Sequence, residues 1–211
     1  MERALATLTD AGFEIAQVFD AHATKAPGWD WLADGPRTGI LVGNTRTLWQ
    51  PFTSAVRADP ALAADPNKLD RYTERTLAGA FPDARIYYSF RRYDGAFLPF
   101  QKLAVALGLG AIAPIGLVIH PDYGPWFALR AVILVDGVPP ATARGPIALP
   151  CQCEAGCRDA LARAQREMTW QAWLGVRDAC TLRAWRYSDD QVRYHYTHAW
   201  PSVDPARKSP G

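Results

Sequence analysis

The residues of this sequence that are best suited to chemistry are His120 and Arg130, which stand on either side of a Tyr-Gly-Pro-Trp turn. An imidazole exchanges protons near neutral pH, and a planar guanidinium binds a carboxylate through two parallel hydrogen bonds. Arg130 interrupts an apolar segment, so its guanidinium needs a partner if the segment is buried. That partner is either an Asp or Glu of the fold or a ligand carboxylate, while His120 either lines a pocket or only closes the loop.

Two apolar, β-branched runs must position these side chains. They cover Ile115–Ile119 and Phe127–Val135, and they predict a strand, a loop and a second strand. Gly116 lies inside the first run, where a glycine indicates either the close approach of a ligand or of another backbone, or a bulge. Gly124 supplies the backbone freedom that the turn needs.

The other predicted elements are mixed irregularly along the chain. Thr38–Gly43 is predicted to be a buried strand, and Glu154–Trp173 has a helical periodicity that we expect to be broken or bent near Gly175. This mixture favours an α+β fold over a strictly alternating, doubly wound one. The length favours one domain over residues 1–211, with a polar, Pro-rich tail at 201–211 that we expect to be frayed.

The composition excludes several classes of function. The chain has 211 residues, of which 49% are hydrophobic, and its 23 basic and 21 acidic residues are intermixed, so nucleic acid is not an expected partner. No apolar run approaches the ~20 residues that span a bilayer, and the first ten residues lack a signal-peptide pattern. We therefore expect no membrane association and a cytoplasmic location. Eight Trp, eight Tyr and eight Phe predict an aromatic core or a wall for a large, flat ligand.

Three of the four cysteines are crowded together, at Cys151, Cys153 and Cys157, and Cys180 follows in a distant segment. A ferredoxin run, Cys-x2-Cys-x2-Cys-x3-Cys, supplies four thiolates to its clusters. Here the first spacing is one residue short, the second is one residue long, and the last cysteine is missing. A bound metal or cluster, a redox-active thiol and a structural thiol loop remain open, and no residue is assigned as a metal ligand.

The segment from His120 to Arg130 resembles the His-Pro-x-aromatic-Gly-x-Trp-Phe-Ala-x-Arg segment of the CblC family of cobalamin-processing proteins, which are cyanocobalamin decyanases and alkylcobalamin dealkylases. Further matches follow in the family's order and cover nearly the whole chain. They are Ala11–Glu14, Gly35–Val42, Asp65–Tyr72, Tyr87–Tyr88, Arg177–Ala179 and Arg186–Gln191 with Tyr194 beyond. The cobalamin domain of epoxyqueuosine reductases is distantly similar.

This resemblance implies a nitroreductase-like α+β fold, with a central, mostly antiparallel sheet flanked by helices, that holds cobalamin in its base-off form. It implies reductive decyanation with reduced flavin (FMN or FAD), or dealkylation by glutathione. Arg130 and Arg177 match family arginines that bind the glutathione carboxylates. The residues expected to bind the corrin are Tyr88, Gly116, His120, Tyr123, Gly124, Trp126 and Phe127.

Other functions compete with this interpretation. The chain could be a cobalamin chaperone that passes the cofactor on without turnover, a cobalamin-dependent reductase akin to epoxyqueuosine reductase, or a plain flavin nitroreductase. The incomplete cysteine motif counts against the reductase, which must receive electrons through bound clusters. Besides cobalamin and a small thiol, a homodimer or a cobalamin-delivery partner is expected by analogy.

Overall fold

A four-stranded antiparallel sheet lies at the centre of the molecule. The computed structural model describes residues 1–139, 145–151 and 154–201. The strand order is β1-β2-β8-β3, and the bounds are Ile15–Asp20 for β1, Thr38–Asn44 for β2, Ala128–Val135 for β8 and Arg85–Tyr88 for β3. Two small hairpins are added, β4 (Arg92–Tyr93) with β5 (Ala96–Phe97), and β6 (Ala111–Ile112) with β7 (Val118–Ile119). The predicted α+β class with an antiparallel sheet is confirmed.

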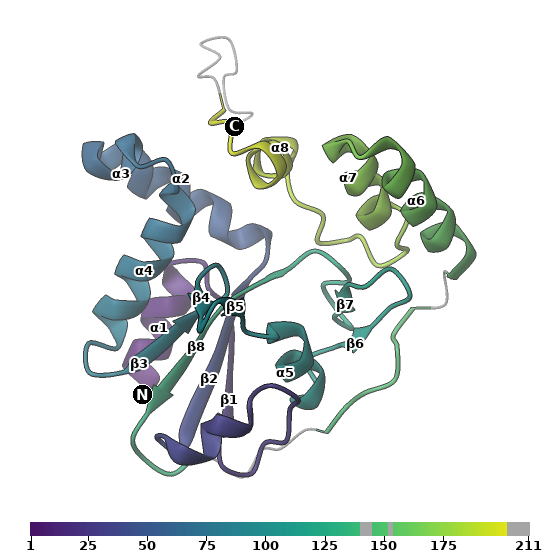
Figure 1. Cartoon of the computed structure of the whole chain (residues 1–211). Helices are drawn as coiled ribbons and strands as arrows, with labels where there is room; N and C mark the ends of the chain where they lie inside the picture. The colour runs from purple at the N-terminus through teal and green to yellow at the C-terminus, as the bar shows by residue number, and fades with distance from the viewer. Residues whose placement is uncertain (140–144, 152–153, 202–211) are drawn as a thin grey trace.

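Helices cover both faces of this sheet and extend beyond one end of it (Figure 1). One face carries α1 (Glu2–Asp10), α2 (Trp49–Ala58), α3 (Pro60–Ala64) and α4 (Lys68–Ala80). The other face carries α5 (Phe100–Ala106) and a short 3-10 helix at Asp30–Asp34, and a second 3-10 turn, Arg46–Leu48, leads into α2. The last helices are α6 (Glu154–Glu167), α7 (Trp170–Asp178) and α8 (Asp189–Thr197).

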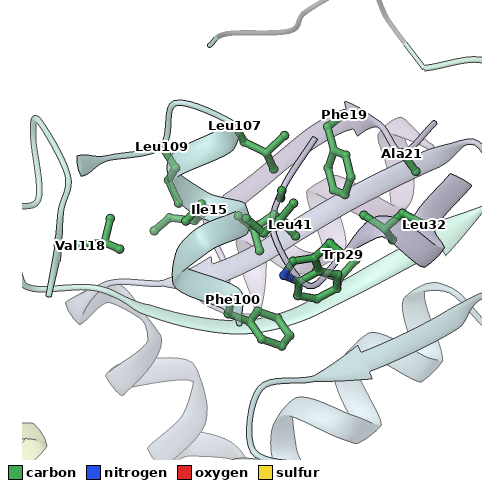
Figure 2. Close-up of a cluster of buried hydrophobic side chains, with 14 of the residues drawn as sticks. Ile15, Phe19, Ala21, Trp29, Leu32, Leu41, Phe100, Leu107, Leu109 and Val118 are labelled. Carbon is green, nitrogen blue, oxygen red and sulfur yellow. The ribbon is translucent and has the colours of Figure 1, made fainter. Parts of the chain in front are cut away.

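Strand β2 is buried on both faces because both faces of the sheet are covered. Its successive side chains point alternately to the two sides. Leu41 joins a cluster with Trp29 and Phe100 on the α5 side, which Figure 2 shows. Ile40 and Val42 join the cluster on the side of α1, α2 and α4. The predicted buried strand at Thr38–Gly43 is therefore confirmed.

A β-bulge interrupts the pairing of β2 with β8. Val42 pairs with Ala131, but Gly43 pairs with Leu129, so Arg130 is the extra residue on β8. A bulge re-aims the side chains of its strand, and bulges are frequent beside active sites. Gly43 permits the close approach, because a Cβ atom there would lie 2.7 Å from the Ala128 carbonyl oxygen.

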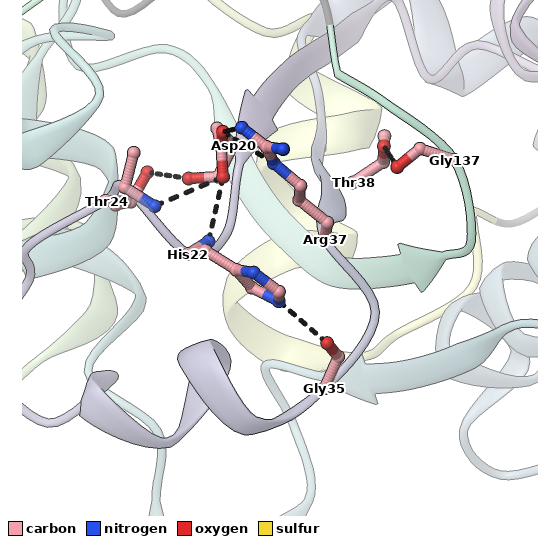
Figure 3. Close-up of polar contacts among 8 residues, drawn as sticks. Asp20, His22, Thr24, Gly35, Arg37, Thr38 and Gly137 are labelled. Atoms are coloured by element: carbon pink, nitrogen blue, oxygen red, sulfur yellow. Dashed lines mark hydrogen bonds and ion pairs between the residues drawn. The ribbon is translucent and has the colours of Figure 1, made fainter.

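The other end of β2 is closed by polar contacts (Figure 3). The Asp20 carboxylate accepts hydrogen bonds from the backbone N–H groups of His22 and Ala23 at 3.0 and 3.1 Å, and it pairs with Arg37 at 2.8 Å. The hydroxyl of Thr38 donates to the Gly137 carbonyl at 3.1 Å. These contacts hold the β1–β2 and β8 connections at the end of the sheet opposite Asn44.

Two details of the prediction are wrong. The first predicted strand is shorter than Ile115–Ile119, because Gly116 lies in the β6–β7 turn with a φ of 76°, where nothing lies within 4 Å of a Cβ position. The glycine is thus needed for the turn, and neither a bulge nor the approach of another backbone accounts for it. The long C-terminal helix breaks at Met168, which has a φ of 51°, whereas Gly175 lies inside α7. The tail at 202–211 lies outside the described residues.

Candidate functional site

Arg130 points from the bulge toward a cavity between β8, α4 and α8. Its Nε donates to the side-chain oxygen of buried Asn44 at 2.6 Å. The cavity has a volume of about 250 Å³, and the residues lining it are Asn67, Leu69, Asp70, Phe90, Arg130, Tyr194, His195 and His198. Within the described ranges the Nη atoms of Arg130 have no hydrogen-bond partner and no carboxylate at ion-pair distance. The partner from the fold is therefore an amide and not the Asp or Glu that we considered.

The second predicted arginine, Arg177, lies at the end of α7 beside the same cluster. Its guanidinium carbon is 5.9 Å from the ring centroid of Trp126, and its buried Nη1 has no hydrogen-bond partner. Trp126 is fully buried and meets the Tyr187 ring edge-on at 5.5 Å. Electrostatic coupling links Tyr187 to both arginines. The fold therefore brings Arg130 and Arg177, distant in sequence, into one charged cluster.

Six buried polar atoms near this cluster lack a hydrogen bond of good geometry in the described part of the chain, although the Tyr187 hydroxyl lies near Arg177 and the Tyr194 hydroxyl lies near the Leu69 backbone. They are Glu14 Oε2, Trp126 Nε1, Arg177 Nη1, Tyr187 Oη, Gln191 Oε1 and Tyr194 Oη. They belong to connected residues: Glu14 binds the backbone N–H and the hydroxyl of Thr45, and Gln191 donates to the Thr45 carbonyl at 3.5 Å. Buried polar atoms are normally paired, so such a group indicates a place that a ligand or water must complete. We call the cluster of these residues the arginine chamber. Its members are Glu14, Trp126, Arg130, Arg177, Tyr187, Gln191, Tyr194 and His195.

Burial and neighbouring charges shift the pKa values of the titratable groups in the chamber. Burial lowers the pKa of Arg130 and raises that of Tyr187, and both arginines oppose the rise at Tyr187. Burial raises the pKa of Tyr194 to about 12. Burial, with repulsion from Arg177, Arg130 and His198, lowers the pKa of His195 to about 3. At neutral pH the imidazole is uncharged, so the two guanidinium groups supply the positive charge.

The loop after β7 forms the wall of a second, larger cavity. The backbone N–H groups of Asp122 and Tyr123 donate to His120 Nδ1 at 3.0 and 3.3 Å, so the proton of the neutral ring sits on Nε2. Burial lowers the pKa of His120, and its ring stacks on Tyr123 with centroids 4.3 Å apart. The cavity has a volume of about 540 Å³, and it is lined by Glu14–Val18, Gly108, Leu109 and His120–Tyr123. His120 thus both closes the loop and lines a pocket.

Gly124 closes this loop against the segment that follows α7. The backbone N–H and carbonyl groups of Gly124 and His120 exchange two hydrogen bonds of 2.9 Å. The φ of Gly124 is 57°, and a Cβ atom there would overlap the Leu182 carbonyl oxygen. Only glycine satisfies both conditions, so this residue fixes where the α7–α8 connection meets the loop.

The remaining predicted corrin contacts lie apart from one another. Tyr88 is buried on the α4 side of the sheet and packs against Phe90 and Arg91. Phe127 is buried on the α5 side, where it lines a separate cavity of about 230 Å³. Gly116 lies in the β6–β7 turn. The fold gathers His120, Tyr123 and Gly124 in one loop and Trp126 in the chamber, but not the whole predicted set.

The chamber contains residues that sequence reasoning missed. Asn44, Tyr187 and His195 were not assigned to the site, although Tyr187 falls in the matched Arg186–Gln191 segment and Asn44 directly follows the predicted strand Thr38–Gly43. Of the cysteines, Cys157 and Cys180 are buried, Cys151 is partly buried, and Cys153 lies outside the described residues. Among the described residues, no group of three or more His, Cys, Asp or Glu side chains could hold a metal ion. No described helix has the length and hydropathy required to cross a bilayer.

Comparison with known proteins assigns the family. The Methylmalonic aciduria and homocystinuria type C (MMACHC) family matches residues 86–202. A Bos taurus cyanocobalamin reductase / alkylcobalamin dealkylase is 35% identical to this chain over 90% of the chain and 75% of that protein. This chain belongs to the MMACHC family. The Homo sapiens protein of the same name is 33% identical over 69% of this chain, and the match spans half of that protein's length (50%).

The MMACHC fold is also shared with a solved structure. The crystal structure of a B12-trafficking protein, CblC, from C. elegans matches with a TM-score of 0.67 and 16% identity, over 92% of this chain and 89% of that one. An epoxyqueuosine reductase structure matches more weakly, with a TM-score of 0.40 and 15% identity over 76% of this chain and 52% of that chain. At these identities the CblC match defines the fold of this MMACHC family member and not its ligands.

Proposed function

We propose that this protein binds cobalamin and removes its upper axial ligand. Both curated relatives are named cyanocobalamin reductase / alkylcobalamin dealkylase, and the chain belongs to their family. The structural observation that carries the proposal is the arginine chamber, where Arg130 and Arg177 have no carboxylate partner among the described residues. Such a pair suits an anionic co-substrate, because each guanidinium can bind a carboxylate.

The co-substrate in the dealkylation reaction is a thiol with carboxylate groups, of which glutathione is the expected example. The guanidinium groups bind and orient its carboxylates, and their charge favours the thiolate over the thiol. The thiolate sulfur attacks the upper alkyl carbon, so a thioether forms and the cobalt–carbon bond breaks. Cobalt keeps the electron pair, which leaves cob(I)alamin, and the thiol proton goes to solvent.

Decyanation needs an electron donor, for which we propose reduced flavin. Cobalamin without its lower base would be easier to reduce. One electron from the reduced flavin, which can supply two cobalamins in turn, would take cobalt(III) to cobalt(II), and the cyanide would leave with its own electron pair. The part of the chain that we assign to cobalamin is the His120–Gly124 loop with Trp126, while Tyr88, Gly116 and Phe127, which lie apart from that loop, remain predicted contacts. A cytoplasmic location, a homodimer and a delivery partner remain predictions.

The test is to mix the purified protein with cyanocobalamin or methylcobalamin and to record the visible spectrum before and after reduced flavin or glutathione is added. We expect a base-off shift on binding, followed by conversion to cob(II)alamin or cob(I)alamin. A base-off shift without any loss of the upper ligand would identify a chaperone instead. A spectrum identical to that of free cobalamin would reject the proposal.

A further inference from the structure

We propose that Asp70 determines which thiols this protein accepts, by binding the α-ammonium group of an amino-acid end whose α-carboxylate is bound by Arg130. The inference rests on the proposed thiol co-substrate and adds a substrate class to it. Thiols that carry a free α-amino-acid group are accepted, and thiols that lack one are discriminated against.

The first observation is that opposite charges face each other across one cavity. Asp70 in the first turn of α4 and Arg130 in the β8 bulge both line the cavity of about 250 Å³. The two groups interact electrostatically, yet no nitrogen of Arg130 is close enough to an oxygen of Asp70 to form an ion pair. The space between a carboxylate and a guanidinium that do not touch suits a zwitterion, which offers a charge to each of them.

The second observation is that both groups retain hydrogen-bonding capacity directed at the cavity. Asp70 is half-buried and accepts no hydrogen bond from the described residues, although it belongs to the first turn of a helix. Burial raises the pKa of its carboxyl group, while Arg130 and His198 oppose this rise. Arg130 uses only Nε for the fold, in its bond to Asn44. A carboxylate in such surroundings gains by binding an ammonium group.

The other residues of the cavity fit a small polar end group. The buried Tyr194 hydroxyl lies near the Leu69 backbone without a hydrogen bond of good geometry, and His195 is uncharged because its pKa is about 3. Phe90 and Leu69 supply apolar surface at the sides. Arg130 gives the cavity a cationic side and Asp70 an anionic side, and the neutral His195 adds no positive charge to either. A thiol with two carboxylates and no amino group would leave Asp70 unpaired.

The experiment compares glutathione with its desamino analogue, glutaryl-cysteinyl-glycine, which lacks only the α-amino group. Binding to the protein is measured by calorimetry, and methylcobalamin dealkylation is measured in parallel as KM and kcat. In the wild-type protein we expect the desamino analogue to bind at least about tenfold more weakly, which corresponds to about 1.4 kcal/mol. Its kcat should change much less than its KM, since Asp70 does not touch the reacting sulfur.

Asp70→Asn should remove this discrimination, so that the variant binds both thiols with equal, weak affinity. The matched control is Asp83→Asn, an exposed carboxylate just beyond the other end of α4, which should discriminate as the wild-type protein does. Equal affinity of the wild-type protein for the two thiols would overturn the proposal, and so would equal weakening of both thiols in Asp70→Asn. If Asp70→Asn does not fold, the comparison of the two thiols on wild-type protein still decides.

Cobalamin binding is recorded separately, from the base-off spectrum without any thiol. If the wild-type protein gives no base-off spectrum, the proposed function is rejected. The calorimetric comparison of the two thiols still tests the role of Asp70 in that case. Failure of both thiols to bind would overturn the inference even if cobalamin binds.

Discussion

Arg130 Nε donates to the side-chain oxygen of Asn44 at 2.6 Å, and this bond ties the guanidinium to the last residue of β2. Asn44 is 1% exposed, and its amide nitrogen donates to the Thr45 carbonyl, so the acceptor is itself held in one orientation. The bulge turns Arg130 out of the regular alternation of β8, and Asn44 fixes where its two Nη groups point. A half-buried cation is thus held by a neutral partner, which leaves its charge available to a ligand.

Substitution of Arg130 should separate thiol chemistry from cobalamin binding. In Arg130→Gln we expect kcat/KM for thiol-dependent dealkylation to fall about 10- to 100-fold, because a charged hydrogen bond contributes about 1.5–3 kcal/mol. Cobalamin binding, followed by the base-off spectrum, should stay within about twofold. Arg92→Gln, at the exposed β4–β5 hairpin, is the control and should change neither. If Arg130→Gln lowered thiol-dependent dealkylation and cobalamin binding by the same factor, Arg130 would have a structural role only.

Gly124 and Gly116 provide a matched pair for backbone strain. Both have positive φ, but a Cβ atom at Gly124 would overlap the Leu182 carbonyl, whereas Gly116 faces open space. We expect Gly116→Ala to lower the free energy of unfolding by about 1–2 kcal/mol, and Gly124→Ala to lower it by about 3 kcal/mol or more. Urea unfolding measures both. Similar losses would mean that the Leu182 segment moves away at little cost.

The indole N–H of Trp126 should serve ligand binding rather than folding. Its Nε1 has no partner in the described structure, whereas Nε1 of the equally buried Trp29 donates to the Pro99 carbonyl at 3.1 Å. Trp29→Phe should therefore destabilise the protein by about 1 kcal/mol more than Trp126→Phe, the value of one hydrogen bond. Trp126→Phe should instead weaken cobalamin or thiol binding in titrations. The reverse order of stabilities would show that Trp126 has a structural partner.

Stability should fall in weak acid because of His195. The pKa of His195 is about 3 in the folded protein and about 6.5 in an unfolded chain. Below pH 6.5 the unfolded chain gains a proton that the folded chain does not, so the free energy of unfolding falls as the pH falls, by up to about 1.4 kcal/mol per unit. The lowered pKa of His120 acts in the same direction.

Urea unfolding between pH 7 and 5 measures this slope. We expect His195→Gln to flatten it, while His22→Gln, at an exposed histidine near Gly35, should leave it unchanged. An unaltered slope in His195→Gln would show that His195 reaches solvent and titrates normally.

Local sequence patterns were sufficient for the fold class, the buried β2 strand and the family, since alternation, helical periodicity and the His120–Arg130 motif are all written in neighbouring residues. They were not sufficient for the helix break. We expected the helix to break near Gly175, but it breaks at Met168, which has the positive φ. Gly175 remains inside α7 because a glycine is tolerated in a helix that packing stabilises.

The sequence by itself determined that Arg130 would need a partner, and that Arg177 belonged to the same family motif set. Only the tertiary structure decided that the partner is Asn44, that a bulge aims Arg130 into a cavity, and that Tyr187, His195 and Asp70 surround it. The physical reason is that a strand register and the docking of α7 and α8 depend on contacts between residues far apart in the chain. No local pattern contains those contacts, so the chamber exists only once the sheet and the last helices have packed together.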